Sequence, residues 1–147
     1  MKGLHPYLYF NGNCHEAMHY YKEHIGGSFD FVGKYADMPP QAGFNVDDSN
    51  KDQIMHMTYS LPDGSKIMAS DVGGEWAPNY QQGNSFSLSL GAESQEEADR
   101  IFNALSKDGK VSMPMQKTFW GDYFGTCTDK FGVNWMISFN EQHLAEN

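Results

Sequence analysis

Residues 61–70 of this chain read LPDGSKIMAS, and residues 127–138 read CTDKFGVNWMIS. Each stretch holds a turn aspartate and a glycine, followed by residues that alternate as in the second strand of a hairpin. When the two are aligned, Met68 lies opposite Met136 and Ser70 lies opposite Ser138. This similarity predicts that one structural unit occurs twice in the chain.

Two helix signals repeat in the same way. Apolar residues recur on one helical face in residues 14–25 and again in residues 94–109. The first run follows a candidate capping pair, N-x-x-E at 13–16, and the second follows S-x-x-E at 94–97. Glycines after each run are natural stops. We therefore predict two capped amphipathic helices.

The other periodic segments read as strands, and they complete a repeat of strand, helix and three strands. The helix starts are 80 residues apart (94 − 14) and the turn aspartates 66 apart (129 − 63), so the first copy holds about fourteen extra residues, assigned to a loop at 36–52. We predict an α+β chain of two βαβββ modules, residues 1–75 and 84–140, within one domain, 1–147. The predicted strands are 3–10, 27–35, 53–61, 65–72, 84–92, 110–119, 121–128 and 133–139.

Residues 15–19, HEAMH, match the H-E-x-x-H pattern of zinc proteases. At about 100° per residue, His15 and His19 point roughly 100–140° away from the apolar stripe, toward the polar side of the helix. A zinc protease also needs a third protein ligand, and no later Glu or His lies in a recognisable ligand motif. We interpret the match as a chance feature of an amphipathic helix.

Composition limits the partners. The formal charge of −9 disfavours nucleic acid, because phosphates would be repelled. It is compatible with a cationic ligand, although a solvated acidic surface is the simpler explanation. No apolar run reaches the ~18 residues needed to span a bilayer, and MKGLHPYLYF (1–10) lacks the apolar segment of a signal peptide. We expect a cytoplasmic protein that binds no membrane, with Cys14 and Cys127 as core residues.

Three stretches carry a resemblance to a known superfamily. They are HPYLYFNGNCHEAMHYYKEHIGG (5–27), IMHMTYSLPDGSKIMASD (54–71) and FWGDYFGTCTDKFGVNWMIS (119–138). The chain resembles the vicinal oxygen chelate superfamily of glyoxalase I, extradiol dioxygenases and bleomycin- and fosfomycin-resistance proteins. The third stretch is most similar to its PhnB-like branch, labelled 3-demethylubiquinone-9 3-methyltransferase-like. The resemblance implies a glyoxalase-like fold, with two βαβββ modules curved around a pocket, usually in a homodimer.

The resemblance also implies four metal-ligand positions, on the first and last strands of each module. They fall at His5 (or Pro6), Ala69, Ser87 and Ile137. Three of these positions hold groups that bind a divalent ion poorly. We therefore predict no metal and no cofactor, which puts the superfamily's metal-dependent reactions in doubt for this chain.

The methyltransferase label lacks support in the sequence as well. No glycine-rich loop follows a strand in a Rossmann context, so a nucleotide-like methyl donor has no visible cradle. A relocated metal site using His5, His56 and Asp71 is the remaining alternative for a metal-dependent reaction.

Candidate pocket residues come from the third strand of each module, where alternate side chains share a face. They are Ile54, His56 and Thr58 in module one, and Trp120, Asp122 and Phe124, each 66 positions later, in module two. We predict His56 and Asp122 as catalytic residues, with His56 as a general base or ligand anchor. The alternative for His56 is a histidine satisfied by a neighbour across the sheet.

Five further residues are predicted to bind the ligand: His5, Asp71, Trp76, Trp120 and Phe124. Asp71 would orient His56 or bind a cation, or else form a strand-end turn. Trp76, in GGEWAPNY (73–80), would close over a ligand or anchor its loop, while the aromatic residues of module two would otherwise be core.

Taken together, these residues predict a PhnB-like protein that binds an unidentified small molecule in a metal-free aromatic and polar pocket, in a homodimer. The alternative is an enzyme, a lyase, isomerase or transferase, that acts on a small metabolite through His56 or a non-standard metal site.

Overall fold

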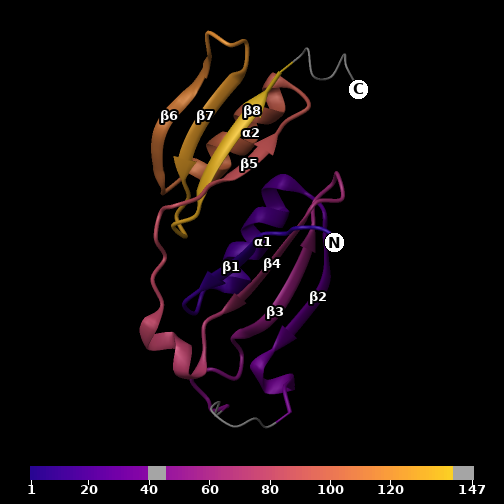
Figure 1. Cartoon of the computed structure of the whole chain (residues 1–147), viewed down its shortest axis with the longest axis vertical. Helices are drawn as coiled ribbons and strands as arrows, with labels where there is room; N and C mark the ends of the chain where they lie inside the picture. Colours follow the sequence, from indigo (N-terminus) through magenta and orange to yellow (C-terminus); the bar gives the residue numbers. More distant parts are fainter. Residues whose placement is uncertain (40–45, 141–147) are drawn as a thin grey trace. The chain divides into compact units, whose positions relative to one another are not determined.

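The computed structural model describes residues 1–39 and 46–140. The chain divides into two compact units, residues 1–82 (unit 1) and 83–147 (unit 2), which are treated separately below. Each unit contains a strand, a helix and three further strands, as Figure 1 shows. The predicted α+β class and the twofold βαβββ order are confirmed.

Unit 1 has a four-stranded sheet with the strand order β1-β4-β3-β2. β1 pairs with β4 in parallel, and the remaining pairs are antiparallel. The elements are β1 (Tyr7–Phe10), α1 (Cys14–Ile25), β2 (Ser28–Lys34), the 3-10 turn η1 (Tyr35–Asp37), β3 (Ile54–Ser60), β4 (Lys66–Asp71) and the 3-10 helix η2 (Gly74–Asn79).

Unit 2 repeats this topology, with the strand order β5-β8-β7-β6 and a parallel β5–β8 pair. Its register supports the sequence alignment, since Met68 faces Tyr7 on β1 and Met136 faces Ser89 on β5. The elements are β5 (Leu88–Gly91), α2 (Gln95–Ser106), β6 (Lys110–Lys117), β7 (Tyr123–Thr128) and β8 (Asn134–Phe139).

In each unit the helix covers one face of its own sheet, and alternate strand residues are buried beneath it. Fully burying a Val, Leu, Ile, Phe or Met side chain stabilises the folded state by about 1.5–3 kcal/mol. The helix-covered faces are therefore the hydrophobic cores of the two units. The face of each sheet opposite α1 or α2, as far as residues 1–39 and 46–140 describe it, is called the open face here. The core residues include Cys14, Ala17, Met18, Tyr21, Met57, Tyr59, Ile67 and Ala69 in unit 1, and Ala98, Ile101, Phe102, Leu105, Cys127, Trp135 and Ile137 in unit 2.

Two helix-capping predictions had different outcomes. Ser94 caps α2 as expected, because its Oγ accepts a hydrogen bond from the Glu97 amide at 3.0 Å. The Asn13 prediction was wrong, since the Asn13 side chain makes no capping hydrogen bond. The amide of Cys14, the first residue of α1, instead donates to the carboxylate of Asp71 at the end of β4.

Asp71 is the last residue of β4, and its carboxylate is 2% exposed. One oxygen accepts the amides of Gly12 at 2.9 Å and Cys14 at 3.0 Å. The other oxygen accepts the amide of Ile54 at 2.8 Å. This carboxylate therefore joins the loop before α1, the first residue of α1 and the first residue of β3.

The turn aspartates close equivalent hairpins in the two units. Asp63 Oδ1 accepts the Ser65 amide at 2.9 Å, and Asp129 Oδ1 accepts the Phe131 amide at 2.9 Å. Asp129 is buried and also receives the indole N–H of Trp135 at 2.9 Å. Both residues form the side-chain turn that the repeat predicted.

Several predicted boundaries need correction. The segments 3–10 and 84–92 begin too early, because β1 starts at Tyr7 and β5 at Leu88. The stretch around Trp76 is the 3-10 helix η2 rather than a loop. The predicted loop 36–52 lies between β2 and β3, and its residues 40–45 lie outside the described residues.

No helix in residues 1–39 and 46–140 is long and apolar enough to cross a membrane. Cys14 and Cys127 are free thiols in the core, as predicted. Burial raises the pKa of both thiols, and that of Cys127 reaches about 11.

We expect the substitution Asp71→Asn to lower the free energy of unfolding by about 2 kcal/mol, because an amide NH₂ would replace a buried acceptor oxygen beside a backbone amide. Chemical denaturation measures this change. The control is Asp63→Asn, in an exposed turn, which should cost less than about 0.5 kcal/mol. Equal losses in the two variants would contradict the bridging role of Asp71.

We expect both thiols to resist a disulfide reagent such as DTNB at neutral pH in the folded protein, because burial blocks access and suppresses the thiolate. In denaturant two thiols per chain should react at once, as absorbance of the released thiolate records. Rapid reaction of either thiol without denaturant would show that its unit opens locally.

Candidate functional site

His56 lies on β3, and its imidazole is hydrogen-bonded at both ring nitrogens. The Tyr7 hydroxyl lies 3.0 Å from Nδ1, and the Thr58 hydroxyl lies 3.2 Å from Nε2. Tyr7 lies on β1, whereas His56 and Thr58 lie on β3. These two hydrogen bonds therefore link three polar side chains from two strands of the sheet into one chain.

Alternation places this chain on the open face of unit 1. Met57 and Tyr59, the neighbours of Thr58 on β3, are fully buried in the core. His56 and Thr58 therefore project from the other side of the strand and are half-buried. The fold thus presents an imidazole and hydroxyl groups on the face of the sheet opposite α1.

Aromatic rings flank His56 on this face. The rings of Tyr7 and Phe31 lie 5.5 Å and 6.0 Å from the imidazole, between centroids. Tyr9 lies 5.0 Å from Tyr7. Tyr9 and Phe31 are 57% and 51% exposed. Large exposed rings around a few polar groups are typical of surfaces that bind small molecules.

Tyr7 is the functional candidate that the sequence analysis missed. Burial raises the pKa of its phenol, with the hydrogen bond from Ser70 opposing that shift. Tyr7 therefore holds its proton at neutral pH and acts toward His56 as a neutral hydroxyl. The available signal was the alternation of PYLYF, but identifying its partner requires the parallel pairing of β1 with β4.

Asp71 belongs to the other side of the sheet. Its two oxygens accept three backbone amides near α1, whereas the ring nitrogens of His56 are bonded to Tyr7 and Thr58. The structure therefore gives Asp71 a structural role and does not bring its carboxylate to His56. Its assignment as a ligand-binding residue draws no support from this geometry.

Three other predicted residues of unit 1 have different placements. Ile54 was expected to share a face with His56, but it is fully buried, and the β2–β3 register shifts between Gly33 and Lys34. This bulge breaks the alternation. His5 is exposed and precedes β1, and Trp76 lies in η2, so the binding roles of these two residues stay predictions.

In unit 2 the three predicted residues come together around the start of β7. The Trp120 indole donates to Asp122 at 2.8 Å, and its ring lies 6.2 Å from that of Phe124. The second oxygen of Asp122 accepts the side-chain amide of Asn140. Trp120 and Asp122 precede β7 and belong to the hairpin loop, not to a strand as predicted.

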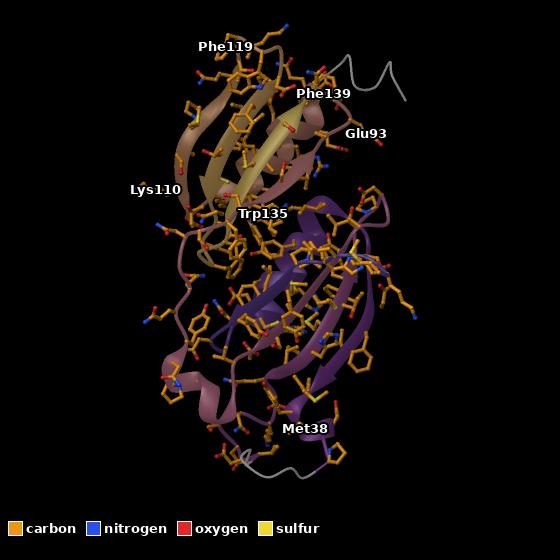
Figure 2. The ribbon with its side chains drawn as sticks, in the orientation of Figure 1. Met38, Glu93, Lys110, Phe119, Trp135 and Phe139 are labelled. Atoms are coloured by element: carbon orange, nitrogen blue, oxygen red, sulfur yellow. The ribbon has the colours of Figure 1, made fainter. Side chains whose placement is uncertain are left out.

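That loop also exposes aromatic surface. Trp120 is 53% exposed and Phe119 is 98% exposed, and Figure 2 shows Phe119 at the tip of the β6–β7 hairpin. Thr118 holds the base of the loop, because its amide donates to the Asp122 carbonyl at 2.8 Å.

The positions suggested by the metal-dependent relatives do not form a ligand set. Ala69 and Ile137 are fully buried on the helix-covered faces, and Ser87 is exposed. Across residues 1–39 and 46–140 no three His, Cys, Asp or Glu side chains gather closely enough to hold a metal ion.

The histidines of HEAMH lie on the exposed side of α1, as predicted. The rings of His15 and His19 are 4.0 Å apart, and His19 packs edge-on against Phe29 at 4.8 Å. Partial burial lowers the pKa of His19, and His15 and Lys22 add to that shift. The pair belongs to the polar side of the helix and not to the open face of the sheet.

Two βαβββ units with matching topology define a glyoxalase-like protein. The same fold occurs in a glyoxylase/bleomycin resistance protein/dioxygenase domain from Frankia sp. EAN1pec, with 14% identity, 96% of this chain and 99% of that chain covered, and a TM-score of 0.64. The chain belongs to the family described as 3-demethylubiquinone-9 3-methyltransferase, whose model matches residues 2–138.

Proteins of higher similarity support this assignment. Protein YjdN of Escherichia coli K12 is 35% identical over 97% of this chain and 99% of its own length. Protein PA1353 of Pseudomonas aeruginosa is 39% identical, with a TM-score of 0.80 over 95% of this chain and 98% of that chain. The PhnB protein of Bacillus cereus is 26% identical, with a TM-score of 0.75 over 94% and 99%.

The family description names a methyltransferase, but each sheet of this chain is mixed, with one parallel strand pair. Neither sheet is the doubly wound parallel type in which a glycine-rich turn presents a helix N-terminus to a nucleotide. The fold therefore supports the family membership and leaves the chemistry to the residues of the site.

We expect Gly33→Ala to move the Phe31 ring away from His56. Gly33 faces His56 in the register, and an added Cβ would lie 2.8 Å from one atom of the Phe31 ring. That ring can turn outward, so the free energy of unfolding should stay within about 1 kcal/mol of the wild-type value. The His56 ring resonances in NMR spectra should shift as the neighbouring ring leaves.

The matched control is Gly91→Ala on β5, where an added Cβ meets nothing within 4 Å. It should leave the His56 resonances unchanged. Unshifted His56 resonances in Gly33→Ala would show that Phe31 does not line the site in solution.

Proposed function

We propose that this protein binds a small molecule on the open face of unit 1, with His56 as the polar anchor. The observation that carries the proposal is the chain Tyr7–His56–Thr58, which places three hydrogen-bonded polar groups from two strands on the face opposite α1. Hydrogen-bonded neighbours hold the imidazole in place, so little order must be gained when a ligand binds.

The surrounding rings supply the apolar part of the site. Phe31 lies beside His56 and Tyr9 lies beside Tyr7, and both rings expose half or more of their surfaces. The half-buried Met68 lies opposite Thr58 in the register. Covering such rings with a ligand removes apolar area from water at roughly 25 cal/mol per Å². The site therefore combines an apolar contact surface with directional polar contacts, which is the usual composition of a small-molecule site.

The proposal requires no metal ion, because hydroxyl and imidazole groups can hydrogen-bond a ligand directly. It retains the homodimer as a further prediction. The sheet edges β2 and β6 consist mostly of exposed residues, and pairing with a second copy is one way to cover such edges. The cytoplasmic location likewise stays a prediction.

A screen of small molecules by thermal unfolding tests the proposal. A ligand present at 100 times its Kd stabilises the folded state by about 2.7 kcal/mol and should raise the Tm by roughly 5–10 °C. We expect His56→Ala to lose this shift. The control His15→Ala changes an exposed helical histidine and should keep it. A shift that survives in His56→Ala would place binding elsewhere, and a broad library without any shift would refute binding.

A second candidate is an enzyme that transfers a proton on a small metabolite. The 3.0 Å contact between the Tyr7 hydroxyl and His56 favours it, because a phenol and an imidazole can pass a proton between them. The two candidates differ in the fate of the bound compound. A binding protein returns the compound unchanged, whereas the enzyme converts it and loses turnover, with the fold intact, in His56→Ala.

A further inference from the structure

The hydrogen-bond chain on the open face has a fixed number of protons. A neutral imidazole carries one N–H, and each of Tyr7 and Thr58 carries one O–H. These three donors serve two hydrogen bonds, which join Tyr7 to His56 and His56 to Thr58. One donor therefore has no acceptor among these three side chains.

The position of the spare donor depends on the imidazole tautomer. If Nδ1 of His56 carries the proton, it donates to the Tyr7 oxygen, and the Thr58 hydroxyl donates to Nε2. The Tyr7 O–H is then left without an acceptor among these three side chains. If Nε2 carries the proton, the Tyr7 hydroxyl donates to Nδ1 and the Thr58 O–H is left. In both tautomers a hydroxyl group of the open face offers a hydrogen.

The charged side chains near the open face do not change the number of spare hydrogen-bond donors there. The residues of β1, β3 and β4 that accompany His56 on the open face (Tyr7, Tyr9, Thr58, Met68 and Ser70) carry no carboxylate. Asp71 faces the helix side, where backbone amides bind both its oxygens. Toward the end of the strands, Lys66 and Asp30 neutralise one another at 2.8 Å.

We propose that the ligand of the open face of unit 1 carries an acceptor oxygen, as in a carboxylate or a carbonyl, attached to an aromatic or other flat apolar body. This inference rests on the proposed function and specifies the ligand class for that site. Such a ligand would accept the spare O–H while its body covers Tyr9 and Phe31. A ligand that covers the face without an acceptor would strip water from that O–H and leave it unpaired, which lowers the affinity.

The proposed ligand class differs from the cationic ligand that the overall charge alone would favour. A net charge of −9 favours cations at long range, and exposed rings can also attract a cation. At an ionic strength of about 0.15 M, however, charges more than about 8 Å away are largely screened. The local donor should then decide which ligand binds.

Three probes that share one ring separate these effects: benzoate, benzyl alcohol and benzylammonium. Each is titrated into the full ¹⁵N-labelled chain at that ionic strength, and the His56 ring nitrogens are followed by NMR. We expect benzoate to bind at least about tenfold more tightly than benzylammonium, because a hydrogen bond to a charged acceptor is the stronger kind, with benzyl alcohol between them. Bound benzoate should also fix one tautomer of His56.

The substitutions Tyr7→Phe and Thr58→Val locate the donor. If bound benzoate fixes the Nδ1–H tautomer, Tyr7→Phe should remove the preference for benzoate. If it fixes the Nε2–H tautomer, Thr58→Val should do so. The control Thr126→Val makes the same change on β7 and should keep the preference. A tautomer and a sensitive variant that disagree would overturn the inference.

The remaining outcomes separate the two proposals. Benzylammonium that binds beside His56 as tightly as benzoate would overturn the ligand class and leave the binding function standing. No change at His56 with any probe would also overturn the ligand class, while the thermal screen with His56→Ala decides the binding function independently.

Discussion

A single buried carboxylate fixes the geometry of unit 1. Asp71 closes β4, and its oxygens accept the amides of Gly12, Cys14 and Ile54. It therefore sets where α1 begins and where β3 begins, two residues before His56. Leaving these amides unpaired in the interior would cost about 1–3 kcal/mol each. In unit 2 the N-terminus of α2 is capped locally by the side chain of Ser94, in place of a carboxylate from a distant strand.

This constraint also explains why the polar groups lie where they do. With Asp71 on the helix side, strand alternation places Ser70 on the open face, where it lies opposite Tyr9 in the β1–β4 register. The bulge between β2 and β3 returns Ile54 to the core while His56 stays outward. The site is thus assembled from ordinary rules of sheets, and its chemistry depends on register, because a slip of one residue would exchange the open face for the core.

Much of the fold could be predicted because its signals are local. The helical stripes, the Ser94 cap and the turn aspartates Asp63 and Asp129 depend on residues within a few positions of one another. The site was less accessible, since Tyr7 reaches His56 only through the parallel pairing of β1 with β4, strands that lie at opposite ends of unit 1 in sequence. The role of Asp71 could not be predicted for the same reason, because its partners Gly12 and Cys14 are far from it in the sequence. Periodicity identified His56 and Thr58 as companions, but it could not locate the bulge that separates them from Ile54.

The two units show how a repeated fold acquires different surfaces. Their registers correspond strand by strand, yet Tyr7 of β1 corresponds to Ser89 of β5, which has no aromatic ring. Unit 2 carries its polar and aromatic groups instead in the loop before β7, where Trp120 and Asn140 share the carboxylate of Asp122. Repetition therefore conserves the core, where packing permits few alternatives, and leaves the open faces and loops free to differ. Overall charge and fold are properties of the whole chain, and neither selects a particular ligand. The number of unpaired hydrogen-bond donors on the open face of unit 1 bears on the choice of ligand more directly.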